Sequence, residues 1–377
     1  MPPSPRLGSV AWAGIPRRPP LPGMTSTGRP LAELRRDPLT GAGVILAPGR
    51  GGRPHDVERG RDRPRDERDY DEDCPFCPGH EASSPTPTLI WPAGGPWQVR
   101  VVPNKYPLVA PPDGVLPAPR GGLLEATPAV GAHEVIVESP HHVRPIARMT
   151  REEVKLVLWA YRERLRALSR APWVRYLVVF KNSGPTAGTS LGHPHSQLVA
   201  LAARPDAVEQ RRAIAREHRA RTGRRLHEDV LAAELRTAER LVATTERFVA
   251  YCPFASAVPF AVDVCPRVAM PSFGDADDAS LLELASLLRD VLQRVAHLLH
   301  DPDYNYVLHT GLVGDPEAAD ESWRLAIEPR VSTAAGFERG SGLGVNTTPP
   351  EEAAARLRDA EPPSRVRSVS RRDTERA

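Results

Sequence analysis

The stretch Gly188-Thr-Ser-Leu-Gly-His193-Pro-His195-Ser-Gln197 decides the fold of this chain. It lies between two apolar runs at 176–180 and 198–201. In an extended strand alternate side chains share a face, so two imidazoles and an amide at i, i+2 and i+4 are expected to project the same way. The sequence therefore predicts one strand face that carries His193, His195 and Gln197.

These three side chains offer several kinds of chemistry. An imidazole can ligate a metal, act as a base or attack phosphorus as a nucleophile, and an amide can both donate to and accept from a phosphate oxygen. The alternative interpretation is a pair of surface histidines beside a turn, which an arbitrary His-x-His sequence often is. The neighbouring motifs favour a functional site.

A pair of cysteines upstream is the first of these motifs. Cys74 and Cys77 form a C-x-x-C pattern, which is typical of half a zinc site, of a redox pair, or of two thiols buried by coincidence. The preceding segment 61–73 is almost entirely charged and offers no core in which to bury thiols. Two thiolates need two further ligands, usually histidines, to close a tetrahedron around zinc. We take His142 and His193 as the candidates.

Taken together, the motifs resemble those of the galactose-1-phosphate uridylyltransferase family, a branch of the histidine-triad superfamily in which two triad-like units are fused in one polypeptide. The resemblance runs in order along most of the chain, which makes it far more specific than any one motif. The matching segments are Arg36-Asp-Pro-Leu-Thr40, Arg50-Gly-Gly-Arg53-Pro54, Cys74-Pro-Phe-Cys-Pro-Gly79, Val102-Pro-Asn104-Lys-Tyr-Pro107, Gly131-Ala-His-Glu-Val-Ile-Val-Glu-Ser-Pro140, Phe180-Lys-Asn182-Ser-Gly184 and the histidine strand.

The expected fold is α+β, with two duplicated histidine-triad-like units whose antiparallel sheets join and whose helices pack on one side. Apolar runs and turn residues predict strands and helices in an order that repeats along the chain. The expected strands are 44–47, 97–102, 133–138, 175–181, 253–265 and 304–310, and the expected helices are 150–168, 205–247 and 279–299. We expect an N-terminal unit at 31–204, holding the zinc site and the catalytic histidine, and a C-terminal unit at 205–358, with disordered segments at 1–30 and 359–377.

The resemblance also implies the roles of individual residues. Zinc would be bound by Cys74, Cys77, His142 and His193, with His142 chosen over His141 because the family has a Ser-Pro-x-His pattern. His195 would be the nucleophile, and Gln197 would hold the phosphoryl oxygens as the second catalytic residue. The nucleotide-binding positions implied are Arg50, Arg53, Asn104, Lys105, Asn182, Gly188, Thr189, Ser190, Gln197, Phe337 and Gly340.

The physical case for such chemistry rests on the charge of a phosphoanhydride. Its oxygens are negative, so catalysis must supply cationic or hydrogen-bonding groups that act most strongly as the transferred group forms. A neutral histidine can attack the α-phosphorus and give a nucleotidyl-histidine intermediate, which the second sugar phosphate resolves. Ping-pong kinetics are expected. The zinc is expected to be structural and orienting, since its four protein ligands leave no open position.

The second half departs from the family pattern. Arg324 and Ala326 stand where relatives carry metal ligands, so a second metal site is expected to be lost and His309 to be a buried, hydrogen-bonded residue. The expected Trp after the first Thr-Gly is replaced by Gly43. The segment 334–342, which includes Phe337, resembles a loop that reaches the nucleotide across a dimer interface, so the resemblance implies a homodimer.

Composition sets broader limits. The net charge of +3 is too small to indicate nucleic-acid binding, and the arginine-rich helix expected at 205–247 also carries interleaved acidic residues, as a solvated face does. No apolar run is long enough to span a membrane, and no signal peptide is evident. We expect a cytoplasmic enzyme without a membrane or nucleic-acid partner, with Met1 or Met24 as its start.

Three functions follow from these observations. The leading hypothesis is uridylyl transfer between UDP-glucose and a hexose 1-phosphate such as galactose 1-phosphate, with a nucleotide sugar and a sugar 1-phosphate as substrates. The first alternative is an ADP-sugar or dinucleoside-polyphosphate phosphorylase, an adenylyltransferase in which phosphate is the acceptor. The second is a degenerate nucleotide-binding paralogue without catalysis. His195 would be the nucleophile both in uridylyl transfer and in the phosphorylase reaction.

Overall fold

The structure is a computed structural model that describes residues 31–50, 68–112, 121–311 and 321–360. The expected extension at 1–30 and nearly all of the expected tail at 359–377 lie outside the described residues. Arg53 lies outside them as well.

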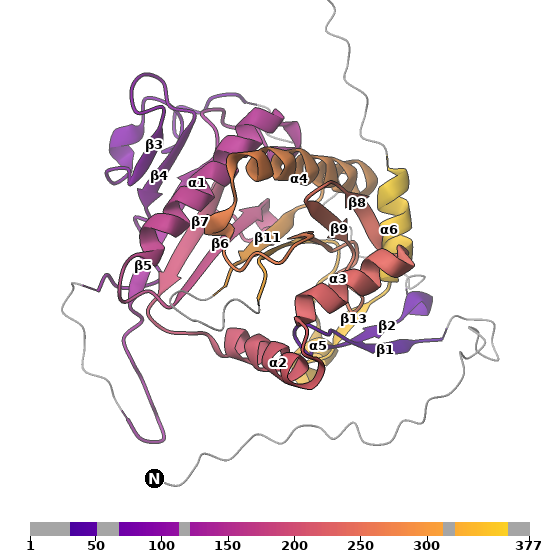
Figure 1. Cartoon of the computed structure of the whole chain (residues 1–377). Helices are drawn as coiled ribbons and strands as arrows, with labels where there is room; N and C mark the ends of the chain where they lie inside the picture. Colours follow the sequence, from indigo (N-terminus) through magenta and orange to yellow (C-terminus); the bar gives the residue numbers. More distant parts are fainter. Residues whose placement is uncertain (1–30, 51–67, 113–120, 312–320, 361–377) are drawn as a thin grey trace, which may run out of the picture.

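One antiparallel sheet of ten strands, in the order β3-β4-β5-β7-β6-β11-β12-β10-β9-β8, forms the centre of the protein (Figure 1). The two halves have the same strand order. Counted from the outer edge of the sheet, the first three strands of each half stand in chain order, and the fifth strand then precedes the fourth. The two halves meet where β6 pairs with β11. The first five strands are β3 Leu89–Trp91, β4 Val99–Pro103, β5 Gly131–Val137, β6 Tyr176–Ser183 and β7 His195–Leu201, and the other five are β8 Leu241–Thr244, β9 Phe248–Tyr251, β10 Val262–Pro266, β11 Tyr304–His309 and β12 Arg324–Pro329.

This repeated order confirms the predicted α+β fold of two joined antiparallel units. The strand expected at 253–265 is shorter than predicted, because only Val262–Pro266 pairs in the sheet. Where one unit ends and the next begins, at 204 and 205, stays a prediction.

Two long helices cover one face of the sheet. Helix α1 (Arg151–Ser169) follows β5 and helix α4 (Asp278–Leu299) follows β10, so they occupy matching positions in the two halves and pack side by side (Figure 1). The predicted capping box at Thr150 is present, and Asp277 caps the second helix through its side chain. Their apolar faces and the inward side chains of both units form one continuous core.

A third helix lies on the opposite face of the sheet. Leu177 and Val179 belong to the core beneath α1 and α4, whereas Tyr176 and Val178 pack against Val208 of helix α2 (Asp206–Thr222). Because alternate residues of a strand face opposite ways, α2 covers the open side at one end of β6.

The single helix expected at 205–247 was wrong. The chain forms α2, turns at Gly223, and continues as α3 (Leu226–Thr237) before β8 begins. Gly223 has φ +75°, which is the left-handed conformation that ends a helix and that glycine adopts without steric cost. Arg212 of α2 is also buried rather than solvated.

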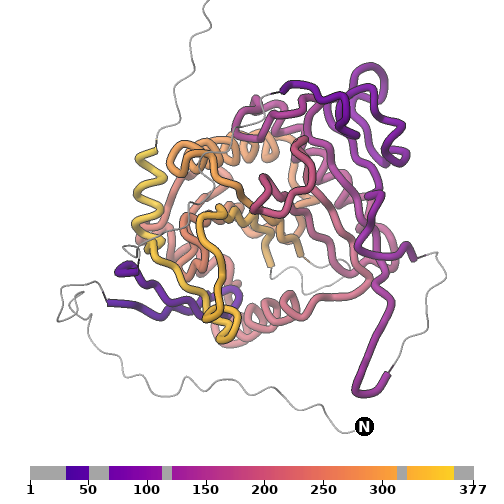
Figure 2. Tube along the Cα trace, turned by 180° about the vertical axis from the view of Figure 1, so that it is seen from behind, coloured from indigo at the N-terminus to yellow at the C-terminus, as the bar shows by residue number. Residues whose placement is uncertain are grey.

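Both ends of the described chain meet in a second, small sheet. Strand β2 pairs with β1 on one side and, in parallel, with β13 on the other, so early and late segments lie together in Figure 2. The elements here and in the connecting loops are β1 Glu33–Arg36, β2 Gly43–Leu46, β13 Gly344–Asn346, α5 Gly336–Ser341, α6 Pro350–Asp359 and the short 3-10 helices Pro48–Arg50, Glu81–Ser83, Ile146–Arg148, Pro185–Ala187 and Phe273–Asp275.

Candidate metal centre and catalytic strand

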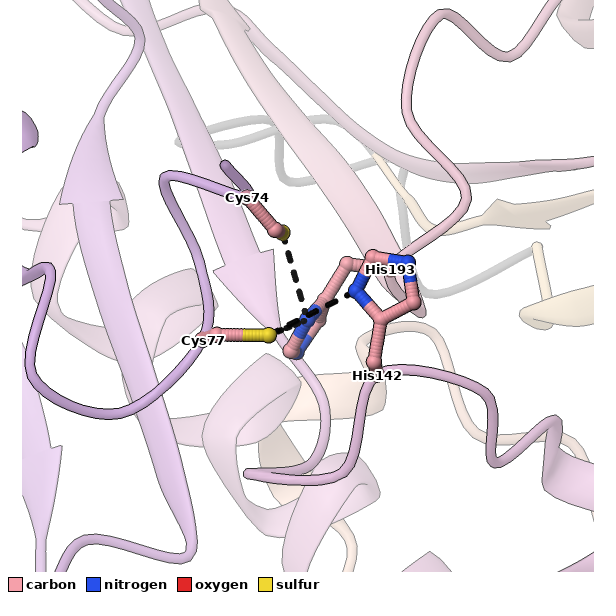
Figure 3. Close-up of side chains that lie close together, drawn as sticks. All are labelled: Cys74, Cys77, His142 and His193. Atoms are coloured by element: carbon pink, nitrogen blue, oxygen red, sulfur yellow. Dashed lines mark hydrogen bonds between the residues drawn. The ribbon is translucent and has the colours of Figure 1, made fainter. Parts of the chain in front are cut away.

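The four predicted metal ligands come together. Cys74 and Cys77 lie on the loop before β3, His142 follows β5 and His193 precedes β7, and all four side chains are buried. One possible ligand atom from each lies within 4.8 Å of the others. Figure 3 shows the two sulfurs and the two rings pointing toward one another.

The spacing of these atoms fits a tetrahedral ion. Cys74 Sγ lies 3.6 Å from His193 Nδ1, and Cys77 Sγ lies 3.4 Å from His142 Nδ1 and 3.7 Å from His193 Nδ1. Bonds of about 2.3 Å to sulfur and 2.0–2.1 Å to nitrogen at tetrahedral angles separate the two ligand atoms by about 3.6 Å. The side chains are therefore arranged as a tetrahedral metal site with two sulfur and two nitrogen ligands requires.

Hydrogen bonds around the cluster orient its members. His193 Nε2 donates to the carbonyl of Ser139 at 2.8 Å, which leaves the lone pair of Nδ1 directed at the sulfurs. Burial lowers the pKa of His193 to about 4, so the imidazole is neutral at neutral pH, as a ligand must be. The backbone N–H of Phe76 donates to Cys74 Sγ at 3.4 Å. His141, the rejected candidate, instead pairs with Asp69 at 2.8 Å.

A buried arginine donates a hydrogen bond to the backbone of the cysteine loop. Arg100 of β4 is fully buried, and its Nη2 donates to the carbonyl of Pro75 at 3.2 Å while its guanidinium lies 5.0 Å from the centre of the Trp97 ring. Sequence reasoning missed this residue, because nothing in a Val-Arg-Val-Val run indicates that the arginine faces inward.

The predicted nucleophile stands at the first position of β7. His195 Nδ1 lies 2.8 Å from the carbonyl oxygen of His193, and a carbonyl can only accept, so Nδ1 carries the proton. The lone pair is therefore on Nε2. Burial is the main cause that lowers the pKa of His195, which keeps the ring neutral at neutral pH.

Gln197, two residues further along β7, is held by a histidine that the sequence analysis did not assign. His133 of β5 accepts a hydrogen bond from the backbone N–H of Leu108 at its Nδ1, so its Nε2 carries the proton and donates to Gln197 Oε1 at 2.8 Å. Because Oε1 of Gln197 is held in this way, the NH2 group of the amide is left to donate to another partner. His133 lies in the quoted Gly-Ala-His-Glu motif, and only the β5–β7 register brings it beside Gln197.

A buried ion pair supports the backbone of His195, the predicted nucleophile. Lys181 of β6 is 3% exposed and Glu138 is 2% exposed. Lys181 Nζ donates to Glu138 Oε2 at 2.6 Å and to the carbonyl oxygen of His195 at 3.1 Å. The pair thus connects β6, the segment after β5, and the first residue of β7.

Hydroxyl groups continue this network into the second unit. Ser196, directly after the nucleophile, contacts Glu138 and the hydroxyl of Tyr161 on α1. Tyr161 in turn contacts Tyr306 on β11. Side chains from both halves of the chain therefore meet beneath β7, and the hydroxyls of Ser196, Tyr161 and Tyr306 are all bonded.

The turn between β6 and β7 is shaped by glycines. Gly184 has φ +88°, and a Cβ there would lie 1.8 Å from Asp303 Oδ1, so no other residue fits. Asp303 accepts from the backbone N–H of Thr186 at 2.7 Å. Asn182 accepts from Asn305 Nδ2 at 2.8 Å. The second unit therefore holds the turn that carries Gly188, Thr189 and Ser190.

The other predicted nucleotide-binding residues are less closely linked to His195 and Gln197 on β7. Asn104 Nδ2 lies 3.2 Å from His133 Nε2 and so adjoins the Gln197 position. Arg50 and Lys105 are exposed, and Phe337 lies half exposed on α5 together with Gly340. Among the described residues, no hydrogen bond or ion pair joins these four to β7, and their nucleotide-binding role stays a prediction.

The second unit carries an arginine where relatives were expected to carry a metal ligand. Arg324 Nη1 donates to both carboxylate oxygens of Asp263, at 2.9 and 3.0 Å, while Ala326 offers no ligand atom. His309 differs from its prediction, because its Nδ1 is buried without a hydrogen-bond partner among the described residues. The expected hydrogen bond was therefore wrong.

In the part of the chain that the structure describes, no helix is long and apolar enough to cross a membrane.

Comparison with known proteins identifies two family profiles in the sequence. Galactose-1-phosphate uridyl transferase, N-terminal domain, matches residues 26–205, and a domain of unknown function (DUF4921) matches residues 125–366.

Individual relatives match over most of the chain. An ADP-glucose phosphorylase of Arabidopsis thaliana is 31% identical over 87% of this chain and 92% of its own length. A galactose-1-phosphate uridylyltransferase of Haemophilus influenzae is 26% identical over 77% of this chain and 81% of its own length. The crystal structure of an Arabidopsis thaliana ADP-glucose phosphorylase with bound ADP-glucose superposes with a TM-score of 0.75 at 28% identity, covering 88% of this chain and 99% of that one.

Proposed function

Because the chain belongs to the galactose-1-phosphate uridylyltransferase family, we propose that it transfers a nucleotidyl group from a nucleoside diphosphate hexose by way of His195. The observation that carries this proposal is the hydrogen bond from His195 Nδ1 to the His193 carbonyl, which places the lone pair on Nε2. A neutral imidazole with one lone pair fixed in position is a nucleophile for phosphorus.

The reaction balances in two steps. In the first, the Nε2 lone pair attacks the α-phosphorus, a P–N bond forms, and the bond from that phosphorus to the bridging oxygen breaks with its electrons on the leaving hexose 1-phosphate. In the second, an oxygen of the acceptor phosphate attacks the same phosphorus and the P–N bond breaks. His195 returns to its neutral form, and the kinetics are ping-pong.

Two neighbours of His195 have separate roles in this scheme. His133 holds Oε1 of Gln197, so the NH2 group of that amide is the part that can donate to a phosphoryl oxygen. Lys181 donates to the carbonyl of His195 and fixes the strand backbone from which the nucleophile projects. Lys181 is therefore a positioning residue, whereas Gln197 is proposed to touch the transferred group.

We infer that the ion held by Cys74, Cys77, His142 and His193 is zinc. Two thiolates and two imidazoles at tetrahedral spacing suit zinc better than a hard cation, which prefers oxygen ligands. Such an ion would supply structural fixation, because four protein ligands leave no position for substrate. It would join the cysteine loop to the residue two positions before the nucleophile.

We favour ADP-glucose as donor and inorganic phosphate as acceptor. Support comes from the ADP-glucose phosphorylase of Arabidopsis thaliana, which is 31% identical over 92% of its own length. Uridylyl transfer from UDP-glucose to galactose 1-phosphate is the second candidate, supported by the N-terminal family profile and by the 26% identical Haemophilus influenzae enzyme. Both reactions use the same covalent intermediate chemistry and differ in base and acceptor.

Product analysis distinguishes the two candidates. The full chain is incubated with ADP-glucose plus phosphate, or with UDP-glucose plus galactose 1-phosphate, and the phosphorus NMR spectrum is followed. Formation of ADP and glucose 1-phosphate in the first mixture supports the phosphorylase. Turnover in the second mixture alone would overturn it in favour of uridylyl transfer, and turnover in neither would support a nucleotide-binding protein without catalysis.

We further propose that the protein is a homodimer. Phe337, in the segment that resembles an interface loop, is 53% exposed on the short helix α5 although it is a large apolar side chain. A dimer mass by light scattering is expected, and Phe337→Asp is expected to shift the protein toward monomer. A monomeric wild type would contradict the proposal.

A further inference from the structure

A cavity of about 80 Å³ lies in the second unit and is not used by the reaction proposed above. It lies between one face of the sheet and the helices α2 and α3 and is partly open to solvent. We call it the arginine cavity, because two arginines line it. Its polar lining residues are Arg211, His227, His309, Thr310, Glu321, Ser322 and Arg324.

The arginine cavity is separate from the catalytic histidine. In the sheet His309 is paired with Val178, and Val178 is paired with Val199 of β7. Val199 lies four residues beyond His195, which corresponds to about 13 Å along a strand. A ligand in the cavity would therefore not contact the reacting phosphorus.

Positive groups outnumber negative ones in this lining. Arg211 and Arg324 both face the cavity, against the single carboxylate of Glu321. Glu321 is already paired, since Arg212 Nε lies 2.9 Å from its Oε1. Arg324 is bonded to Asp263 through Nη1 alone, so its other nitrogens are not used by that pair.

His309 also lines the cavity. Its Nδ1 is buried without a hydrogen-bond partner among the described residues, which is unfavourable for a polar atom. Burial and then the charges of Arg324 and Arg211 hold the pKa of His309 well below its usual range. Positive surroundings of this kind exclude a metal cation and favour an anion.

We propose that the arginine cavity binds a small tetrahedral oxyanion, of which inorganic phosphate is the representative, held by Arg211 and Arg324 beside the ring of His309. A cavity of about 80 Å³ has room for a ligand of this size. The ion would accept hydrogen bonds from the guanidinium groups of the two arginines.

The test is isothermal titration of inorganic phosphate into the full, metal-loaded chain at constant ionic strength. Arg211→Gln and His309→Phe are each expected to weaken phosphate binding at least tenfold. Arg219→Gln, on the same helix but outside the lining, is the matched control and is expected to leave the affinity unchanged. Melting temperatures recorded without phosphate show whether each variant is folded, and either of the two cavity variants suffices for the comparison.

Two further arms separate this site from the catalytic strand. Gln197→Ala is expected to keep the phosphate binding that depends on Arg211. If Gln197→Ala abolishes all binding while the cavity variants bind like wild type, the anion belongs to the catalytic site and the proposal is wrong. Glucose 1-phosphate is titrated in parallel, and binding of it that is lost in Arg211→Gln would contradict the assignment of a small free anion. Absence of any phosphate binding in wild type would overturn the proposal outright.

Discussion

Replacing Lys181 by methionine tests the buried network under the catalytic strand. Glu138 and Lys181 are 2% and 3% exposed, and the Nζ–Oε2 distance is 2.6 Å. Methionine keeps most of the volume of lysine but leaves the Glu138 carboxylate without its cation. Removing one partner of a buried ion pair costs about 3–5 kcal/mol, because a buried charge remains uncompensated.

Lys155→Met is the matched control, since it makes the same chemical change at the surface. Lys155 Nζ lies 3.7 Å from Asp278, and its side chain is 33% exposed. Exposed pairs contribute about 0–1 kcal/mol. Urea-induced unfolding, followed by fluorescence on metal-loaded protein, gives both free-energy changes.

The double variant Lys181→Met, Glu138→Gln separates charge from packing. It is expected to recover part of the stability lost by Lys181→Met, since it removes the stranded carboxylate. The hydrogen bond from Lys181 to the His195 carbonyl is lost in both proteins, so both are expected to form the nucleotidyl enzyme more slowly. A loss in Lys181→Met no larger than that in Lys155→Met would refute the reasoning.

Three further predictions concern the metal, the amide and a buried imidazole. Cys74→Ser is expected to lose stoichiometric zinc by elemental analysis and to unfold at lower urea, whereas Cys252→Ser keeps the metal; equal zinc in both would count against the site. His133→Phe is expected to lower kcat about 10–100-fold with little change in KM, because the Gln197 amide loses its fixed orientation; unchanged kcat would show that His133 does not position it. In phosphate-free buffer the free energy of unfolding is expected to fall as the pH drops below 6.5. The contribution of His309 is about 1.4 kcal/mol per pH unit, because its ring binds a proton in the unfolded chain but stays neutral in the folded protein. His309→Phe removes that share of the slope, and an unaltered slope would contradict the burial argument.

Local sequence patterns predicted those site residues that lie close to one another in the sequence. Strand alternation placed His195 and Gln197 on β7, and the C-x-x-C spacing indicated a ligand pair. The choice of His142 over His141 came from family resemblance, and no spacing rule would have made it. The capping box at Thr150 is a purely local signal, and it predicted the start of α1.

Contacts across the sheet could not be predicted in the same way. His133 reaches Gln197 because β5 pairs with β7 in one particular register, and Lys181 reaches Glu138 because β6 lies on the other side of β7. Neither register can be deduced from the spacing of the residues along the chain. The break at Gly223 is different, because a glycine after a run of helical residues is a recognised end signal and could have been used.

Intact-protein mass spectrometry tests the central claim most directly. Metal-loaded wild-type and His195→Asn proteins are each incubated with ADP-glucose or UDP-glucose and no acceptor, after matching melting temperatures are confirmed. We predict one nucleotidyl adduct on wild type, none on His195→Asn, and loss of the adduct when the acceptor is added. An adduct of equal amount on His195→Asn, or no adduct on wild type with either donor, would contradict nucleotidyl transfer through His195.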